Sequence, residues 1–219
     1  LPSWNADTPA NTGLSFSVRT RDAQSGEWSP YLYLGQWGRT IHWPSRTLWF
    51  EDKNGAAGAI NTDYLILRRP ATAFQVRVDF WTFDREGLVR PALRRFNMVY
   101  SGVVDDAAER ARLWEGGFPP SRDRSTGAEV DLDMPFYGNG MTGDAMKSST
   151  CSPSSITMVM EWLGVQRPLL ENCEAIFDPE YGIFGNWPRN VARAADFGLT
   201  GEVERIRSWA RVRHELEQG

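Results

Sequence analysis

The hydrophobic pattern of this 219-residue chain changes period once, and this change constrains the fold more than any other feature. From Gly13 to about Gly102, apolar residues recur at every second position, as in "LSFSVRT" and "FQVRVDFWTF". A period of two is typical of β-strands, and turn-forming segments such as 22–26, 52–58 and 85–87 separate these runs. We therefore expect an antiparallel β-sandwich over residues 1–104, with one face of each sheet in water.

After Cys151 the period becomes 3.6, which is typical of helices. The segment "CSPSSITMVMEWLG" predicts one helix, ending at Gly164, and three more are expected in "RPLLENCEAIF", "NWPRNVARAADFG" and "SWARVRHELEQG". Residues 134–219 are thus predicted to be mainly helical. Residues 105–133, rich in charge, Pro and Ser, are predicted to be a linker or an ordered tether. The expected fold class is α+β.

Composition limits the classes of function. A formal net charge of -4 gives no electrostatic reason to expect a nucleic-acid partner, and no apolar run is long enough to cross a bilayer. Two cysteines do not make a disulfide framework. Ten tryptophans beside only two histidines favour aromatic packing over a metal site. We therefore expect no bound metal and no cofactor.

Cys151 has two interpretations. At the start of a helix, unpaired N–H groups and the positive end of the helix dipole favour a thiolate, as a nucleophile requires. The alternative is a small apolar residue that precedes a helix, and the pattern by itself favours this alternative. The second cysteine, Cys173, is expected to be a buried free thiol in the middle of its helix.

A cysteine nucleophile needs a base, which is normally a histidine. His42, in "TIHWPS", lies between predicted strands, where a loop or strand-edge role is the better interpretation. His214, in "VRHELE", lies among charged residues on a predicted helix, as on a solvated face. Neither is placed convincingly as a base, so this chain by itself lacks half of a catalytic triad.

Several motifs together carry a resemblance to a known family. In the second half these are "MPFYGNGM", "CSPSSITMVMEWLGV" and "DPEYGIFGNWPRNVARAADFGLTGEVERIRSW"; in the first half they are "PSWNADTP", "WSPYLYLGQWG", "NTDYLILRRPATAFQVRV" and "PALRR". The chain resembles secreted bacterial proteins of cysteine peptidase family 39, a papain-like group related to bacteriocin-processing peptidases. The resemblance covers nearly the whole chain, including the β-domain that precedes the peptidase domain.

The resemblance implies a cysteine peptidase acting on a peptide or protein substrate outside the cytoplasm, with Cys151 as nucleophile. It places the oxyanion-hole amide, usually Gln, on Asn139; the alternative is that Asn139, between two glycines, is a turn residue. In the family, a later strand with a "GH" motif and then an "NDP" motif supply the base and its acid, whereas this chain ends at Gly219. A missing C-terminal segment or a partner chain is therefore expected to complete the papain-like domain. The alternative function is a non-catalytic extracellular binding or scaffold protein whose β-domain binds glycan or protein.

Overall fold

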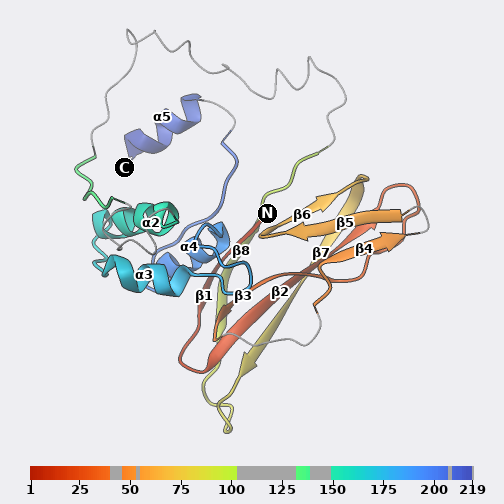
Figure 1. The fold of residues 1–219 in the computed structure, drawn as a ribbon, viewed down its shortest axis with the longest axis horizontal. Helices are drawn as coiled ribbons and strands as arrows, with labels where there is room; N and C mark the ends of the chain where they lie inside the picture. Colours follow the sequence, from red (N-terminus) through yellow and green to blue (C-terminus); the bar gives the residue numbers. More distant parts are fainter. Residues whose placement is uncertain (40–45, 53–54, 103–131, 139–148, 207–208, 219) are drawn as a thin grey trace.

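The computed structural model describes residues 1–39, 46–52, 55–102, 132–138, 149–206 and 209–218 (Figure 1). The described part is mixed α/β, with strands in the first half and helices in the second, as the change of period predicts. The strands are β1 Pro2–Asp7, β2 Thr12–Asp22, β3 Leu32–Gly38, β4 Trp49–Asp52, β5 Gly55–Asn61, β6 Tyr64–Leu67, β7 Ala71–Thr82 and β8 Ala92–Met98. The helices are α2 Cys151–Trp162, α3 Leu169–Ile176, α4 Trp187–Ala195 and α5 Trp209–Gln218.

The described strands form three antiparallel sheets, with the orders β1-β8, β3-β2-β7 and β4-β5-β6. The core is built on aromatic rings from three strands. The ring of Trp4 in β1 stacks on that of Phe16 in β2, with centroids 4.1 Å apart, and Phe16 lies 5.8 Å from Phe96 in β8. The first two sheets therefore share one hydrophobic core.

Strand β2 corrects one expectation from the sequence. Its apolar residues are buried as predicted, but Ser15 and Ser17 on the opposite face are also buried, 3% and 6% exposed. The strand is central in its sheet, and the indole of Trp81 leans across Gly13 on that second face, where a Cβ atom would clash with it. The prediction of one wet face per sheet is therefore wrong for β2.

Strand β3 depends on one glycine. Gly35 has a φ of +152°, and a Cβ atom there would lie 3.2 Å from the indole of Trp4. The register between β2 and β3 shifts beside this residue, between Phe16 and Ser17. Glycine is required here because the bulge needs a backbone conformation that other residues rarely adopt, and because Trp4 fills the space of a side chain.

The four helices that the sequence predicts are present, each slightly shorter than its predicted segment. α2 is followed by Gly164 in the left-handed conformation, with a φ of +86°, and α3 begins after Pro168. Helix α4 packs against the strands: Ala192 is completely buried and belongs to the same core as Trp4 and Phe16. Figure 1 shows α2, α3 and α4 gathered on one side of the β1 and β8 pair. Within the described residues, no helix is long and apolar enough to span a bilayer.

Candidate functional site

Cys151 is the first residue of α2, and its side chain is exposed. The preceding Thr150 is completely buried, and its carbonyl accepts the N–H of Ser154 at 2.9 Å. Pro153 in the first turn has no N–H, and no acidic side chain lies in this turn. The thiol is therefore accessible at the positive end of a helix dipole, without a carboxylate in the first turn to oppose that charge.

The exposed face of α2 continues from the thiol along the helix. Ser155, Val159 and Leu163 follow Cys151 at intervals of four and are all exposed, Val159 by 37% and Leu163 by 48%. Residues four apart are neighbours on a helix surface, so these four residues form one row, here called the Cys151 stripe. A partly apolar row that ends at a thiol can contact a further polypeptide.

The opposite face of α2 is tied to the other helices by buried polar side chains. The hydroxyl of Thr157 donates to the carbonyl of Pro153 at 2.7 Å and accepts a hydrogen bond from the Nδ2 of Asn172 at 2.9 Å. Asn172, in α3, is completely buried, and its Oδ1 accepts the Nε of Arg193 at 2.8 Å. These bonds satisfy polar groups that would otherwise be buried without partners, and they fix α2, α3 and α4 relative to one another.

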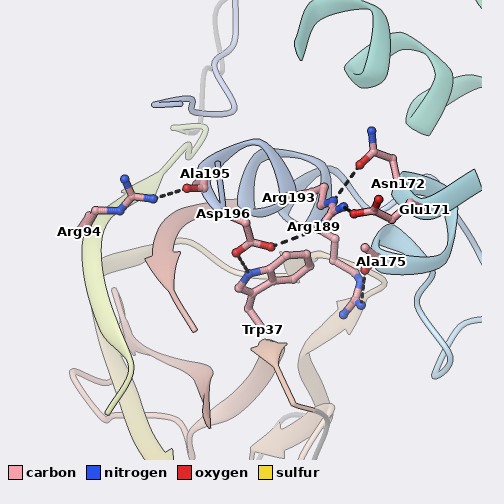
Figure 2. Close-up of polar contacts among 9 residues, drawn as sticks. All are labelled: Trp37, Arg94, Glu171, Asn172, Ala175, Arg189, Arg193, Ala195 and Asp196. Carbon is pink, nitrogen blue, oxygen red and sulfur yellow. Dashed lines mark hydrogen bonds and ion pairs between the residues drawn. The ribbon is translucent and has the colours of Figure 1, made fainter. Parts of the chain in front are cut away.

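This series of contacts continues into the β-strands (Figure 2). The Nη1 of Arg193 lies 3.8 Å from the carboxylate of Asp196, and the other oxygen of Asp196 accepts the indole N–H of Trp37 in β3 at 3.1 Å. Burial raises the pKa of the Asp196 carboxyl, while the bond from Trp37 and the charge of Arg193 lower it. We call Thr157, Asn172, Arg193, Asp196 and Trp37 the α2–β3 network.

Arg189 joins the same elements a second time. Its guanidinium donates to the carbonyls of Ile176 at 2.8 Å and Ala175 at 3.2 Å, at the end of α3. It also donates to the carbonyl of Gln36 at 3.4 Å and lies over the ring of Trp37, 5.2 Å from its centroid. A cation suits the C-terminal carbonyls of a helix, so Arg189 caps α3 and links it to β3.

The start of α4 is capped from outside its own segment. The carboxylate of Asp63, between β5 and β6, accepts the backbone N–H of Trp187 at 3.2 Å. Burial raises the pKa of Asp63, and the bond from Trp187 opposes this shift. The segment "NWPRN" was identified in the sequence only as part of a motif. In the structure, it attaches the helices to the strands.

A pocket of about 420 Å³ lies at the same junction, between β3 and the segment around Asp178. The guanidinium of Arg46 forms an ion pair with Glu180 and lies over the ring of Tyr33, 4.4 Å from its centroid. Burial raises the pKa of the Tyr33 hydroxyl. The lining residues are Tyr33, Leu34, Gly35, Gln36, Arg46, Leu48, Asp178, Pro179, Glu180, Tyr181 and Arg189. Such a lining, with two phenols and both signs of charge, can hold a small polar group.

The other predicted site residues fall as follows. Asn139 and His42 lie outside the described residues. His214 is exposed on α5, beside an ion pair of 2.7 Å between Arg211 and Glu215, which agrees with a solvated face. Cys173 is free and buried in α3, as predicted, and burial raises the pKa of its thiol.

No sequence pattern singled out Tyr137, whose hydroxyl donates to Glu161 in α2 at 2.5 Å. This bond, the largest cause, raises the pKa of Tyr137. The chain is therefore held against α2 just before it reaches Asn139. Among the residues that the structure describes, no three His, Cys, Asp or Glu side chains are grouped to hold a metal ion.

Comparison with known proteins finds a match for the first half of the chain. No curated protein and no solved structure matches it. A family model described as "Peptidase C39 N-terminal domain" matches residues 1–101, a range that holds β1 to β8 and ends before Cys151. The first half is therefore similar to the N-terminal domain of peptidase C39 proteins, which supports a relationship between this chain and that peptidase family.

Proposed function

We propose that this protein is a cysteine-dependent peptide-bond hydrolase of the papain-like type, with Cys151 as the nucleophile. The observation that carries the proposal is the exposed Cys151 thiol at the first residue of α2, in a chain whose first half is similar to a peptidase-associated domain. In this proposal, residues 1–104 are a β-sandwich and residues 134–219 are the helical half of a papain-like domain. We propose an extracytoplasmic location from the resemblance to secreted proteins.

The proposed reaction forms and breaks a thioester. The Cys151 sulfur attacks the carbonyl carbon of the scissile peptide bond, and a histidine takes the thiol proton and returns it to the leaving amine. Water then hydrolyses the thioester and restores the thiol. The Cys151 backbone N–H and the Asn139 amide would donate to the developing oxyanion, where one donor is typically worth about a hundred- to a thousand-fold in rate.

The histidine is proposed to come from a partner chain or from a C-terminal segment beyond Gly219. His214 lies among exposed charges on α5, which does not suit a base. The Cys151 stripe supports a completing polypeptide, because Val159 and Leu163 leave apolar surface exposed beside the thiol. Such a polypeptide would cover this surface and bring the base to the sulfur.

The test compares the 219-residue chain with the polypeptide that includes the residues encoded after Gly219. The longer polypeptide is expected to cleave a mixed peptide substrate, and Cys151→Ala is expected to abolish this activity. Cys173→Ala is the matched control, because it removes the other thiol and leaves Cys151 in place. The 219-residue chain alone is expected to be inactive. Activity that persists in Cys151→Ala would refute the proposed nucleophile.

The oxyanion role of Asn139 is tested in the same active polypeptide. Asn139→Ala is expected to lower kcat about a hundred-fold or more, whereas Asn139→Gln, which keeps the amide, is expected to retain activity. If both variants keep full activity, Asn139 is a turn residue and the second donor comes from elsewhere.

The second candidate is a binding or scaffold protein without catalysis. The pocket of about 420 Å³ beside Tyr33 and Tyr181 favours it, since its size and mixed polar lining suit a glycan unit or a peptide side chain. Ligand binding that is unchanged by Cys151→Ala and lost in Tyr181→Ala, in a protein without peptide cleavage, would favour this function over the peptidase.

A further inference from the structure

Strand β7 has one open edge. Within the part of the chain that the structure describes, β7 is hydrogen-bonded to a strand on one side only, the β2 side. Its 12 residues present a row of backbone N–H and C=O groups about 40 Å long on the other side. An edge of this length is a template for pairing with another extended strand.

The same edge leaves apolar side chains uncovered. Phe74, Val76, Val78 and Phe80 pair with core-facing residues of β2 and so point to the core side of the sheet. Phe74 is nevertheless 43% exposed, although its ring lies 5.9 Å from that of Tyr100, and Phe80 is 54% exposed. A further strand beside β7 would cover these side chains.

The charges on the other face indicate which strand fits. Arg77 and Asp79 lie on either side of Val78, and their side chains are 53% and 44% exposed. In an antiparallel pair of two β7 strands centred on Val78, Arg77 of each copy lies opposite Asp79 of the other. On the core side, the same register places Val76 opposite Phe80.

Neighbouring registers are unfavourable. Centring the pair on Arg77 or on Asp79 would place two like charges directly opposite each other, which is destabilising. We therefore propose that the open edge of β7 binds β7 of a second copy of this chain, forming a two-fold symmetric dimer centred on Val78.

The present contacts of Arg77 do not oppose this pairing. Its Nε lies 3.2 Å from Asp79 of its own strand, and its guanidinium lies 4.8 Å from the centre of the Tyr31 ring. An ion pair that is about half exposed contributes little to stability, so exchanging it for a contact across the dimer costs little.

The test measures the dissociation constant of the full 219-residue chain by analytical ultracentrifugation, from about 1 to about 100 µM. The unchanged chain is expected to dimerise in this range. Arg77→Asp and Asp79→Arg are each expected to raise the dissociation constant at least about ten-fold, because each places like charges opposite each other twice. The double exchange, Arg77→Asp with Asp79→Arg, is expected to restore the dimer, since opposite charges then face each other again.

Arg68→Asp is the matched control, because it makes the same change of charge at an exposed position outside β7 and is expected to leave the dissociation constant unchanged. Thermal unfolding of each variant checks that it is folded; if one charge reversal unfolds the chain, the other carries the test. A chain that stays monomeric at about 100 µM, a dimer that Arg77→Asp weakens no more than Arg68→Asp does, or a double exchange as weak as its single variants would each overturn the proposal.

Discussion

Arg193→Met is expected to lower the free energy of unfolding by about 3 kcal/mol. The Arg193 side chain is 10% exposed, and it donates to Asn172 at 2.8 Å and lies 3.8 Å from Asp196. A hydrogen bond from a charged donor contributes about 1.5 to 3 kcal/mol, and its loss leaves the completely buried Asn172 without this partner. The ion pair with Glu171, which is 44% exposed, adds at most about 1 kcal/mol. Leaving the Asp196 carboxylate, whose side chain is 25% exposed, without its cation supplies the rest.

Arg95→Met is the matched control. Arg95 also links the strands to the chain beyond α4, through an ion pair of 2.7 Å with Glu202, but the two side chains are 48% and 34% exposed. The same substitution there is expected to cost about 1 kcal/mol or less. Urea unfolding followed by tryptophan fluorescence measures both variants, and an equal cost at the two positions would refute the importance of the α2–β3 network. In a double-mutant cycle, Asn172→Leu and Arg193→Met are expected to show a coupling of about 1 kcal/mol or more.

Three further predictions concern single groups. Iodoacetamide at mildly acidic pH is expected to label the exposed Cys151 well before the buried Cys173, whose pKa burial raises; peptide mapping by mass spectrometry checks this, and earlier labelling of Cys173 would contradict it. Burial also raises the pKa of the Asp196 carboxyl above 3.8, so protonation of this group stabilises the folded state. This stabilisation is fully present below pH 3.8 and is lost as the pH rises through the pKa of the folded state. In urea titrations, the unchanged chain should therefore gain stability relative to Asp196→Asn as the pH falls from 7 to 4, and an unchanged difference would count against a raised pKa of this carboxyl. Asp63→Ala removes the acceptor at the first turn of α4 and is expected to cost about 1 kcal/mol, with Asp63→Asn costing less; equal unfolding energies for the two variants would show that the acceptor does not matter.

Periodicity predicts what depends on neighbouring residues in the chain. Alternation located β2 and β7, and the 3.6 period located α2, because each element buries one face whose spacing is visible locally. The alternation wrongly predicted that Ser15 and Ser17 are exposed, because the residues that cover the second face of β2 are distant in the sequence. The predicted turn over 52–58 was also wrong at Gly58, which lies within strand β5.

The candidate site also has a part that the local sequence predicts and a part that it does not. The place of Cys151 at a helix start follows from local pattern and from proline in the first turn. The partners of Asn172, Arg193 and Asp196 do not, since a hydrogen bond such as that from Trp37 joins residues 159 positions apart. Polar side chains in a helix give no local sign of which distant group they will meet.

The hydrogen bonds between β1 and the segment that follows α4 can form only late in synthesis. The Asn5 amide exchanges hydrogen bonds with the backbone of Gly201 at 2.7 and 3.1 Å, and Ser3 accepts the N–H of Val203 at 3.0 Å. β1 can pair with β8 when about half of the chain has left the ribosome, yet its remaining polar partners follow roughly 5 to 20 seconds later, at about 5 to 20 residues per second. During that interval the face of β1 that α4 covers is open to chaperones and to other nascent chains, so aggregation in the cell should be most sensitive to substitutions on this strand.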